Sequence, residues 1–274
     1  MIRKILFAII LGLIGYLAFQ ETFPFGEGFL VLITCLTALW LLSLYLKDAS
    51  IIDIFWGLGF VIIAWYYRTQ LNLSDVRSLI YCILISVWGL RLSIHLAFRN
   101  IGKGEDYRYQ EWRNQYKQNW WWVSFLRVFL LQGILLWIIS SVFAPAMISK
   151  NTSFSILDCV GIILWTIGLA FETIGDWQLV SFKKNPDNKG KVLQEGLWAL
   201  TRHPNYFGDA LLWWGFFLFA CSNGAIIHIF CPLLMSFLLM KVSGVTLLEK
   251  KLLETKSDYE TYAKRVPAFF PKLF

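Results

Sequence analysis

Long apolar stretches, each followed by a short polar segment, recur along the whole chain of 274 residues. An α-helix rises about 1.5 Å per residue, so about 20 apolar residues cross a hydrocarbon core of about 30 Å. Eight stretches are predicted spans, and they leave no room for a soluble domain. They are residues 5–19, 29–46, 51–67, 79–98, 120–148, 154–182, 210–220 and 225–247. The seventh is short, so it either starts earlier, near Tyr206, or is partly re-entrant.

The composition agrees with a membrane protein, because 57% of the residues are hydrophobic and only 16% are charged. Soluble domains average about 45–50% apolar and about 25% charged residues. Collagen, coiled coils and disordered chains are excluded, and the predicted fold is an all-α, polytopic membrane helical bundle. The first apolar stretch follows Arg3 and Lys4 as a signal peptide would, but residues 20–28 offer no small-residue cleavage site. We therefore expect a retained transmembrane helix.

Lysine and arginine indicate the orientation, because cytoplasmic loops carry an excess of them. With both termini in the cytoplasm, only Arg68, Arg77 and Lys150 of the 25 basic residues fall in outer loops. The excess of basic over acidic residues is thus explained by the membrane topology, and it gives no support to nucleic-acid binding. Five cysteines, Cys35, Cys82, Cys159, Cys221 and Cys231, form no CxxC pair and are interpreted as small apolar residues, with no metal site expected.

Ionisable residues inside the predicted spans gather toward the cytoplasmic side. Such groups are costly in a membrane and usually face a cavity or a partner. They are Asp53, Arg91, His95, Arg127, Glu172, Asp176 and Asp209. Glu172 with Asp176, and Arg91 with His95, are four residues apart and share a helix face. We expect several spans to converge on one polar cavity open to the cytosol, although a purely structural ion network is the alternative.

Two cytosolic segments are richer in polar groups than a connector requires. Residues 99–119 contain the run from Gly102 to Tyr109, which is either a functional loop or a solvated turn and helix. Residues 183–209 contain four lysines, one arginine and one histidine. Arginine and lysine bind phosphate groups, so this segment predicts an anion cradle. There is no Gly-x-Gly-x-x-Gly, so a nucleotide would not bind in Rossmann fashion. Residues 248–261 predict an amphipathic helix on the membrane.

Several motifs resemble those of a known enzyme family. Thr201 to Asp209, with the sequence TRHPNYFGD, resembles the Arg-His-x-Asn-Tyr-x-Gly-Asp signature of membrane sterol reductases. The ending, from Lys256-Ser-Asp-Tyr-Glu-Thr-Tyr262 through Val266-Pro267 to Phe270-Pro271, is similar to the C-terminus of those proteins. Ser50-x-x-Asp53-x-x-Trp-Gly, Trp88-Gly-x-Arg91-Leu and Gly104-Glu-Asp-Tyr-Arg-Tyr109 are similar to the bacterial branch of the steroid 5-alpha-reductase family. The resemblance covers about residues 30 to 274.

The resemblance implies a seven-helix reductase-like core at residues 29–274, with an extra N-terminal transmembrane helix at residues 1–28. It implies that NADPH binds in a cavity open to the cytosol and that a steroid-like or isoprenoid lipid enters from the bilayer. Hydride passes to the C=C bond of an enone while a hydrogen-bond donor polarises the carbonyl. We expect the bacterial inner membrane as the location, with both termini and the cofactor site cytoplasmic.

The resemblance also implies roles for individual residues. Asp53 stands near the position of the carbonyl-polarising acid, and it would have to be protonated to donate. The expected catalytic residues are Asp53, Arg91 and His95. The residues expected to bind the cofactor are Asp106, Arg108, Glu172, Asp176, Lys191, Arg202, His203, Asn205, Tyr206, Asp209 and Tyr259.

Three departures from the family pattern bear on the substrate. Trp88 stands where the steroid enzymes have a tyrosine, Glu172 replaces a neutral amide, and Asp53 is one methylene shorter than the expected glutamate. Two alternatives therefore stay open. Isoprenylcysteine and phospholipid methyltransferases share Arg-His-Pro-x-Tyr and a related tail, and they use S-adenosylmethionine. A non-catalytic lipid-binding membrane protein is the other.

Overall fold

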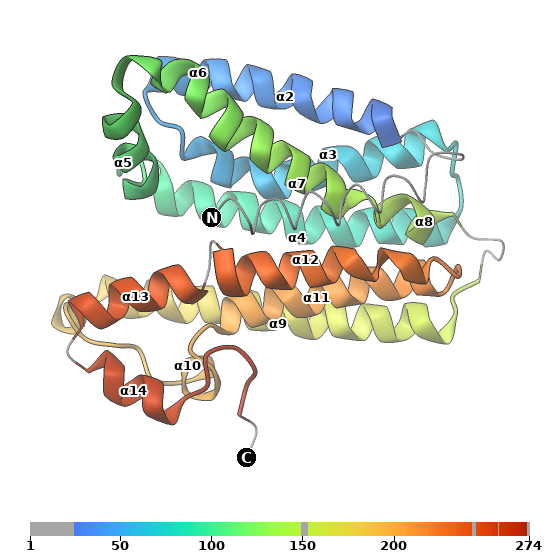
Figure 1. Cartoon of the computed structure of the whole chain (residues 1–274). Coiled ribbons are helices and arrows are strands. Elements are labelled where there is room, and N and C mark those ends of the chain that lie inside the picture. Colours follow the sequence, from blue (N-terminus) through green and yellow to red (C-terminus); the bar gives the residue numbers. More distant parts are fainter. Residues whose placement is uncertain (1–24, 149–152, 243–244, 257, 273–274) are drawn as a thin grey trace. The chain divides into compact units, whose positions relative to one another are not determined.

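The computed structural model describes residues 25–148, 153–242, 245–256 and 258–272, without the side chains of Leu247 and Lys251. Within these ranges every regular element is a helix, which confirms the predicted all-α fold (Figure 1). The chain divides into two compact units, residues 1–153 and 154–274. The first predicted span, residues 5–19, lies outside the described residues, so the extra N-terminal helix stays a prediction.

Unit 1 consists of long apolar helices with one short polar helix at an end. Its long helices are α2 (Phe25–Leu46), α3 (Ile51–Gln70) and α4 (Val76–Asn100). They are followed by α5 (Tyr107–Tyr116), a 3-10 turn (Lys117–Asn119), α6 (Trp120–Ser124), a π-helical turn (Phe125–Leu130), α7 (Leu131–Ser140) and α8 (Phe143–Met147). In Figure 1, α5 lies where α3 begins and α4 ends.

Unit 2 is built around two neighbouring helices, α9 (Ile156–Lys184) and α11 (Pro204–Cys221). Between them come a 3-10 turn (Pro186–Asn188) and α10 (Leu197–Leu200). After them come a 3-10 turn (Ile226–Ile229), α12 (Phe230–Phe237), a π-helical turn (Leu238–Val242), α13 (Val245–Thr255) and α14 (Tyr259–Arg265). The helix that contains the seventh predicted span thus begins earlier than Ala210, at Pro204, close to the alternative start near Tyr206, and that it spans the membrane stays a prediction.

Five helical runs in the described residues are long and apolar enough to cross a membrane: α2, α3, α4, the run Tyr107–Met147, and α9. They correspond to the second through sixth predicted spans. The eighth coincides with a shorter apolar run, Ile226–Val242. The chain is therefore an integral membrane protein, whereas the number of eight spans stays a prediction.

Polar residues at the expected positions begin several of these helices. The Asp75 side chain accepts a hydrogen bond from the Ser78 backbone N–H at 2.8 Å at the start of α4. Ser155 and Asp158 form a reciprocal capping box at the start of α9. α11 starts with Pro204, whose missing N–H would have no partner inside the helix. Local sequence therefore sets these helix ends.

Glycines hold the backbones of α9 and α11 in direct contact. A Cβ atom built on Gly168 would lie 2.5 Å from the Gly208 carbonyl oxygen, and one on Gly161 would lie 2.8 Å from the Gly215 oxygen. The partner numbers fall as the α9 numbers rise, so the two helices are antiparallel. Small residues allow such close approach, which drives helix association in lipid, where burial of apolar side chains gains little.

The same contact places the start of α11 against the last turns of α9. A Cβ on Gly175 would lie 3.0 Å from the Pro204 ring and 3.3 Å from the Asn205 backbone nitrogen. The TRHPNYFGD segment is thereby fixed beside the polar residues of α9. The position of this segment therefore depends on the spacing of the glycines in α9.

We predict that Gly168→Ala lowers the free energy of unfolding by about 1–3 kcal/mol, the usual effect of overpacking a tight contact. The reason is that the added methyl group meets backbone atoms of α11, which cannot move aside alone. Gly26→Ala on α2 is the control, because a methyl group added there would meet no atom within 4 Å. Thermal unfolding of the purified protein measures both, and equal stability of the two variants would contradict the packing assignment.

Candidate functional site

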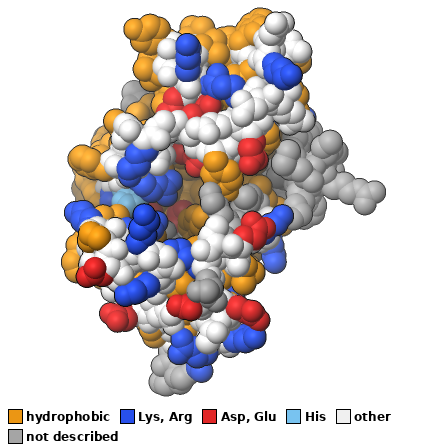
Figure 2. Space-filling view, turned by 90° about the vertical axis from the view of Figure 1, so that its left-hand side faces the viewer, with side chains coloured by type: hydrophobic (Ala, Val, Ile, Leu, Met, Phe, Trp, Pro, Cys, Tyr) orange, Lys and Arg blue, Asp and Glu red, His pale blue; other side chains and the backbone are white. Residues whose placement is uncertain are grey.

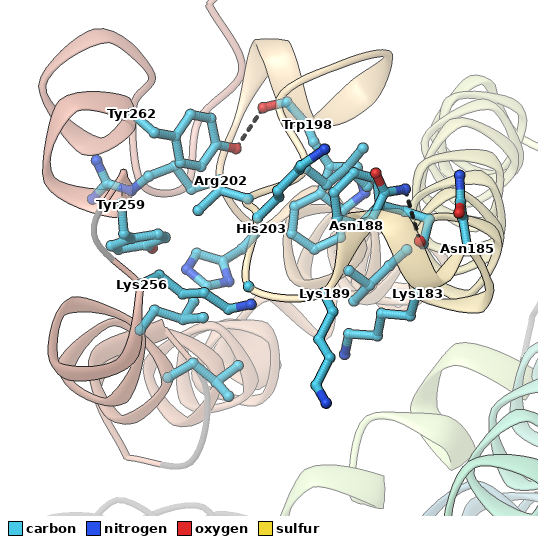
Figure 3. A pocket seen from close by; sticks show the side chains of 18 of the residues that line it. Lys183, Asn185, Asn188, Lys189, Trp198, Arg202, His203, Lys256, Tyr259 and Tyr262 are labelled. Atoms are coloured by element: carbon cyan, nitrogen blue, oxygen red, sulfur yellow. Dashed lines mark hydrogen bonds between the residues drawn. The ribbon is translucent and has the colours of Figure 1, made fainter.

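A cavity of about 460 Å³ opens in unit 2 between the end of α9, the loop after it, α13 and α14 (Figure 3). Small-molecule sites usually enclose about 300–1,000 Å³. Its lining residues are Leu179, Phe182, Lys183, Asn185, Pro186, Asn188, Lys189, Gly190, Lys191, Val192, Leu193, Trp198, Arg202, His203, Leu248, Leu252, Lys256, Tyr259 and Tyr262. Four residues predicted to bind the cofactor belong to this set: Lys191, Arg202, His203 and Tyr259.

The charged side chains that line the cavity are all basic. Lys183, Lys189, Lys191 and Lys256 line it together with Arg202, and no aspartate or glutamate is among the described lining residues. In the view of Figure 2, lysine and arginine side chains lie beside a histidine, and aspartate and glutamate side chains lie elsewhere on the same face. Such a lining attracts an anion with more than one negative charge.

Flat and apolar side chains complete the cavity. Trp198, Tyr259, Tyr262 and several aliphatic residues contribute to its wall. The Trp198 indole N–H donates to the Gly175 carbonyl at 3.0 Å, and the Tyr262 hydroxyl donates to the Trp198 carbonyl at 2.5 Å. These bonds fix the rings, so the wall offers a preformed surface for a planar group beside the basic residues.

Arg202 is held by three segments of unit 2. Its backbone N–H donates to the Pro267 carbonyl at 2.9 Å, and its Nη1 donates to the carbonyls of Ala263 and Val266 at 2.6 and 2.8 Å. Its Nε donates to Glu249 Oε1 at 2.7 Å. Several N–H groups of the guanidinium are therefore used to hold the C-terminal tail and α13 beside the cavity. The sequence did not suggest this role.

Glu249 of α13 is the carboxylate beside the cavity. Besides Arg202, the same Oε1 contacts His203 Nε2 and accepts from the Tyr259 hydroxyl, both at 3.3 Å. Burial raises the pKa of Glu249, but the hydrogen bonds and positive charges of His203 and Arg202 outweigh burial and bring it to about 2. Glu249 is therefore ionised at neutral pH.

The other predicted residues of unit 2 lie on the paired helices α9 and α11. The Asn205 side-chain amide donates to Asp176 Oδ1 at 2.9 Å. Glu172 and Asp209 are both buried. Tyr206 stacks on the His203 ring with centroids 5.7 Å apart, which links this group to the cavity wall. The roles assigned to these five residues stay predictions.

In unit 1, Asp53 is contacted by side chains of residues 99–119, the segment that the sequence left open between a functional loop and a solvated turn and helix. Arg108 Nη2 donates to Asp53 Oδ2 at 2.8 Å, and the Tyr109 hydroxyl donates to Oδ1 at 2.7 Å. Arg108 also pairs with Asp106 at 2.8 Å. Burial raises the pKa of Asp106, but the Arg108 hydrogen bonds outweigh it, so the net pKa lies below the ordinary value. The structure thus brings together Asp53, Asp106 and Arg108, as the motifs suggested.

The direction of the hydrogen bonds around Tyr109 follows from its neighbours. The Trp56 indole can only donate, and it donates to Gln132 Oε1 at 2.6 Å. Gln132 Nε2 is thereby left to donate to the Tyr109 hydroxyl oxygen at 3.2 Å. The hydroxyl proton must then point to Asp53, which accepts hydrogen bonds on both oxygens.

Arg91 and His95 lie half-buried one turn apart on α4. Trp88, in place of the expected tyrosine, is 1% exposed and its ring centroid lies 5.6 Å from that of Phe60. Trp88 is therefore part of the core of unit 1. That the polar residues of both units line one cavity stays a prediction.

Sequence reasoning missed Tyr109, Glu249 and Lys256 as site residues. Tyr109 was present in the quoted motif, but nothing showed that α5 folds back onto the first turn of α3. Glu249 and Lys256 are charged residues in a charged helical tail, and only their contacts in the fold distinguish them from their neighbours.

The chain belongs to the family DUF1295, described as a protein of unknown function, whose model matches residues 39–266. An uncharacterized protein of Schizosaccharomyces pombe is 24% identical over 283 residues, covering 93% of this chain and 82% of that protein.

Two shorter matches have named activities. A probable O-methyltransferase of Ustilaginoidea virens is 42% identical over 66 residues, or 24% of this chain and 22% of that protein. A steroid 5-alpha-reductase of Gossypium hirsutum is 32% identical over 75 residues, or 23% of this chain and 29% of that protein. No solved structure gives a significant match. The comparisons confirm the resemblance to the steroid 5-alpha-reductase-like membrane superfamily.

Proposed function

We propose that this member of the DUF1295 family is an NADPH-dependent reductase of the C=C bond of an enone-type lipid. The observation that carries the proposal is the unit 2 cavity, whose charged lining is basic throughout the described residues. The partial similarity to a steroid 5-alpha-reductase supports the same reaction class.

The charge of the cavity favours NADPH over S-adenosylmethionine. NADPH carries a pyrophosphate and a 2′-phosphate, each of which attracts lysine and arginine. S-adenosylmethionine carries a sulfonium and an ammonium group against a single carboxylate. A cavity with four lysines and an arginine among its lining residues would repel both cationic groups.

The residues of the cavity fit the parts of NADPH. Lys183, Lys189, Lys191 and Lys256 would hold its phosphates, and the fixed Trp198 ring would pack against a planar group. NADPH, when bound, supplies the hydride for the enone β carbon. The protein has to position the lipid, exclude water and provide a proton.

In unit 1, we assign the proton donor to Tyr109 and not to Asp53. Both Asp53 oxygens accept hydrogen bonds, one from Arg108 and one from Tyr109, whereas a tyrosine hydroxyl carries a proton that it can donate. The Tyr109 hydroxyl would turn from Asp53 to the lipid carbonyl and give its proton to the enolate. The proton would return from solvent, with Arg108, 5.3 Å from the Tyr109 ring, stabilising the tyrosinate. Asp53 and Arg108 then act as positioning residues.

Methyl transfer from S-adenosylmethionine is the second candidate function. It is favoured by the match to a probable O-methyltransferase, which has a higher identity than the reductase match over a similar length. The two functions require different cofactors, so ligand binding separates them.

We predict that NADPH raises the unfolding temperature of the purified protein, with a smaller effect of NADH and none of S-adenosylmethionine, because a ligand that binds only the folded state stabilises it. Lys256→Gln should weaken NADPH binding about tenfold, as expected for loss of one charge-assisted contact. The matched control is Lys250→Gln, because Lys250 is exposed on α13 outside the cavity. Stabilisation by S-adenosylmethionine alone would overturn the reductase assignment.

We predict that Tyr109→Phe lowers turnover about 100-fold or more, the usual contribution of a general acid, and leaves the NADPH affinity unchanged. Tyr116→Phe is the control on the same helix, since Tyr116 contacts Arg127 through its ring. Single-turnover NADPH oxidation with a membrane lipid extract reports the rate, and titration reports the affinity. Equal loss of both in Tyr109→Phe would mean that the Tyr109 hydroxyl is structural.

A further inference from the structure

One oxygen atom of unit 2 joins three residues that line the same cavity. Glu249 Oε1 contacts Arg202 Nε at 2.7 Å, His203 Nε2 at 3.3 Å and the Tyr259 hydroxyl at 3.3 Å. Arg202, His203 and Tyr259 all line the cavity, whereas Glu249 does not. Figure 3 shows the three side chains along one wall. Glu249 therefore contacts this wall from outside the lining.

The three partners come from different segments of unit 2. Arg202 and His203 precede α11, Tyr259 begins α14, and Glu249 itself is on α13. Arg202 also binds the carbonyls of Ala263 and Val266 in the tail. A single carboxylate thus fixes how α13, α14 and the TRHPNYFGD segment meet at the cavity.

From this geometry we infer that Glu249 is a positioning residue for anion binding, which fixes Arg202, His203 and Tyr259 in the wall that an anion would contact. The identity of the anion as NADPH rests on the proposed function, but the positioning role does not. Glu249 holds Arg202 Nε, His203 Nε2 and the Tyr259 hydroxyl, so it fixes these side chains in the wall, while the four lysines supply the remaining positive charge of the lining.

Removal of the Glu249 charge should change the affinity for an anion. A positioning role and a purely electrostatic role predict changes of opposite sign. A carboxylate near the site, if it only added negative charge, would repel an anionic ligand, and its loss would tighten binding. A positioning carboxylate has the opposite effect, because its loss releases the three side chains and weakens binding. If Glu249 were merely structural, its loss would lower the stability of the protein but would not weaken anion binding by the folded protein.

The experiment compares NADPH binding and pyrophosphate binding in the full-length wild type, Glu249→Gln and Glu249→Asp. The matched control is Glu260→Gln on α14, because Glu260 also has a basic partner, Lys264 at 2.8 Å, but its side chain is 70% exposed. We expect Glu249→Gln to bind NADPH at least tenfold more weakly, Glu249→Asp to recover part of the loss, and Glu260→Gln to match the wild type.

Each outcome decides one question. Equal or tighter NADPH binding by folded Glu249→Gln would overturn the positioning role and leave the proposed function intact. Wild-type protein that binds pyrophosphate but not NADPH would overturn the proposed function, and weaker pyrophosphate binding by Glu249→Gln would still support positioning. Wild-type protein that binds neither anion would overturn both. If Glu249→Gln does not fold, the comparison of Glu249→Asp with the wild type takes its place, with weaker binding expected.

Discussion

The backbone contact between α9 and α11 is the constraint on which unit 2 depends. Glycines at Gly161, Gly168 and Gly175 let α11 approach until main-chain atoms touch, and this approach fixes where the TRHPNYFGD segment begins. Trp198 then bonds back to the Gly175 carbonyl, and Arg202 gathers the C-terminal tail. The position of the cavity residues on α10 and before α11 therefore depends on the packing of α9 against α11.

Two networks of opposite character result from the fold. In unit 2, basic residues line a cavity, and the Glu249 carboxylate contacts three of the lining residues. In unit 1, acidic and basic groups pair closely, and a directed chain of hydrogen bonds ends at Asp53. The basic cavity of unit 2 is suited to bind an anion, and the hydrogen-bond chain of unit 1 is suited to hold and donate a proton. A reductase needs both, whereas methyl transfer needs neither a polyanion site nor a proton donor.

Much of the fold could be predicted from the sequence, because long apolar stretches have few solutions in a membrane. The described helices at residues 25–46 and 156–184 match predicted spans closely. In the cavity, Arg202 and His203 were predicted from one continuous motif, and Lys191 and Tyr259 from separate segments. Tyr109 and Glu249 could not be found, since their roles arise from contacts with residues far away in the sequence. The role of Asp53 stays a prediction, and the sequence did not specify that Arg108 and Tyr109 both donate to it.

Isotope labelling is the most direct test of the proposed hydride transfer to a lipid. Membranes that contain the protein would be incubated with NADPH deuterated at the nicotinamide C4 and with S-adenosylmethionine labelled with ¹³C in its methyl group. Mass spectrometry of the extracted lipids would then show which label is incorporated. We expect a lipid that gains one deuterium from the cofactor and one proton by reduction, dependent on the protein. Entry of the ¹³C methyl group without deuterium would contradict hydride transfer and identify a methyltransferase.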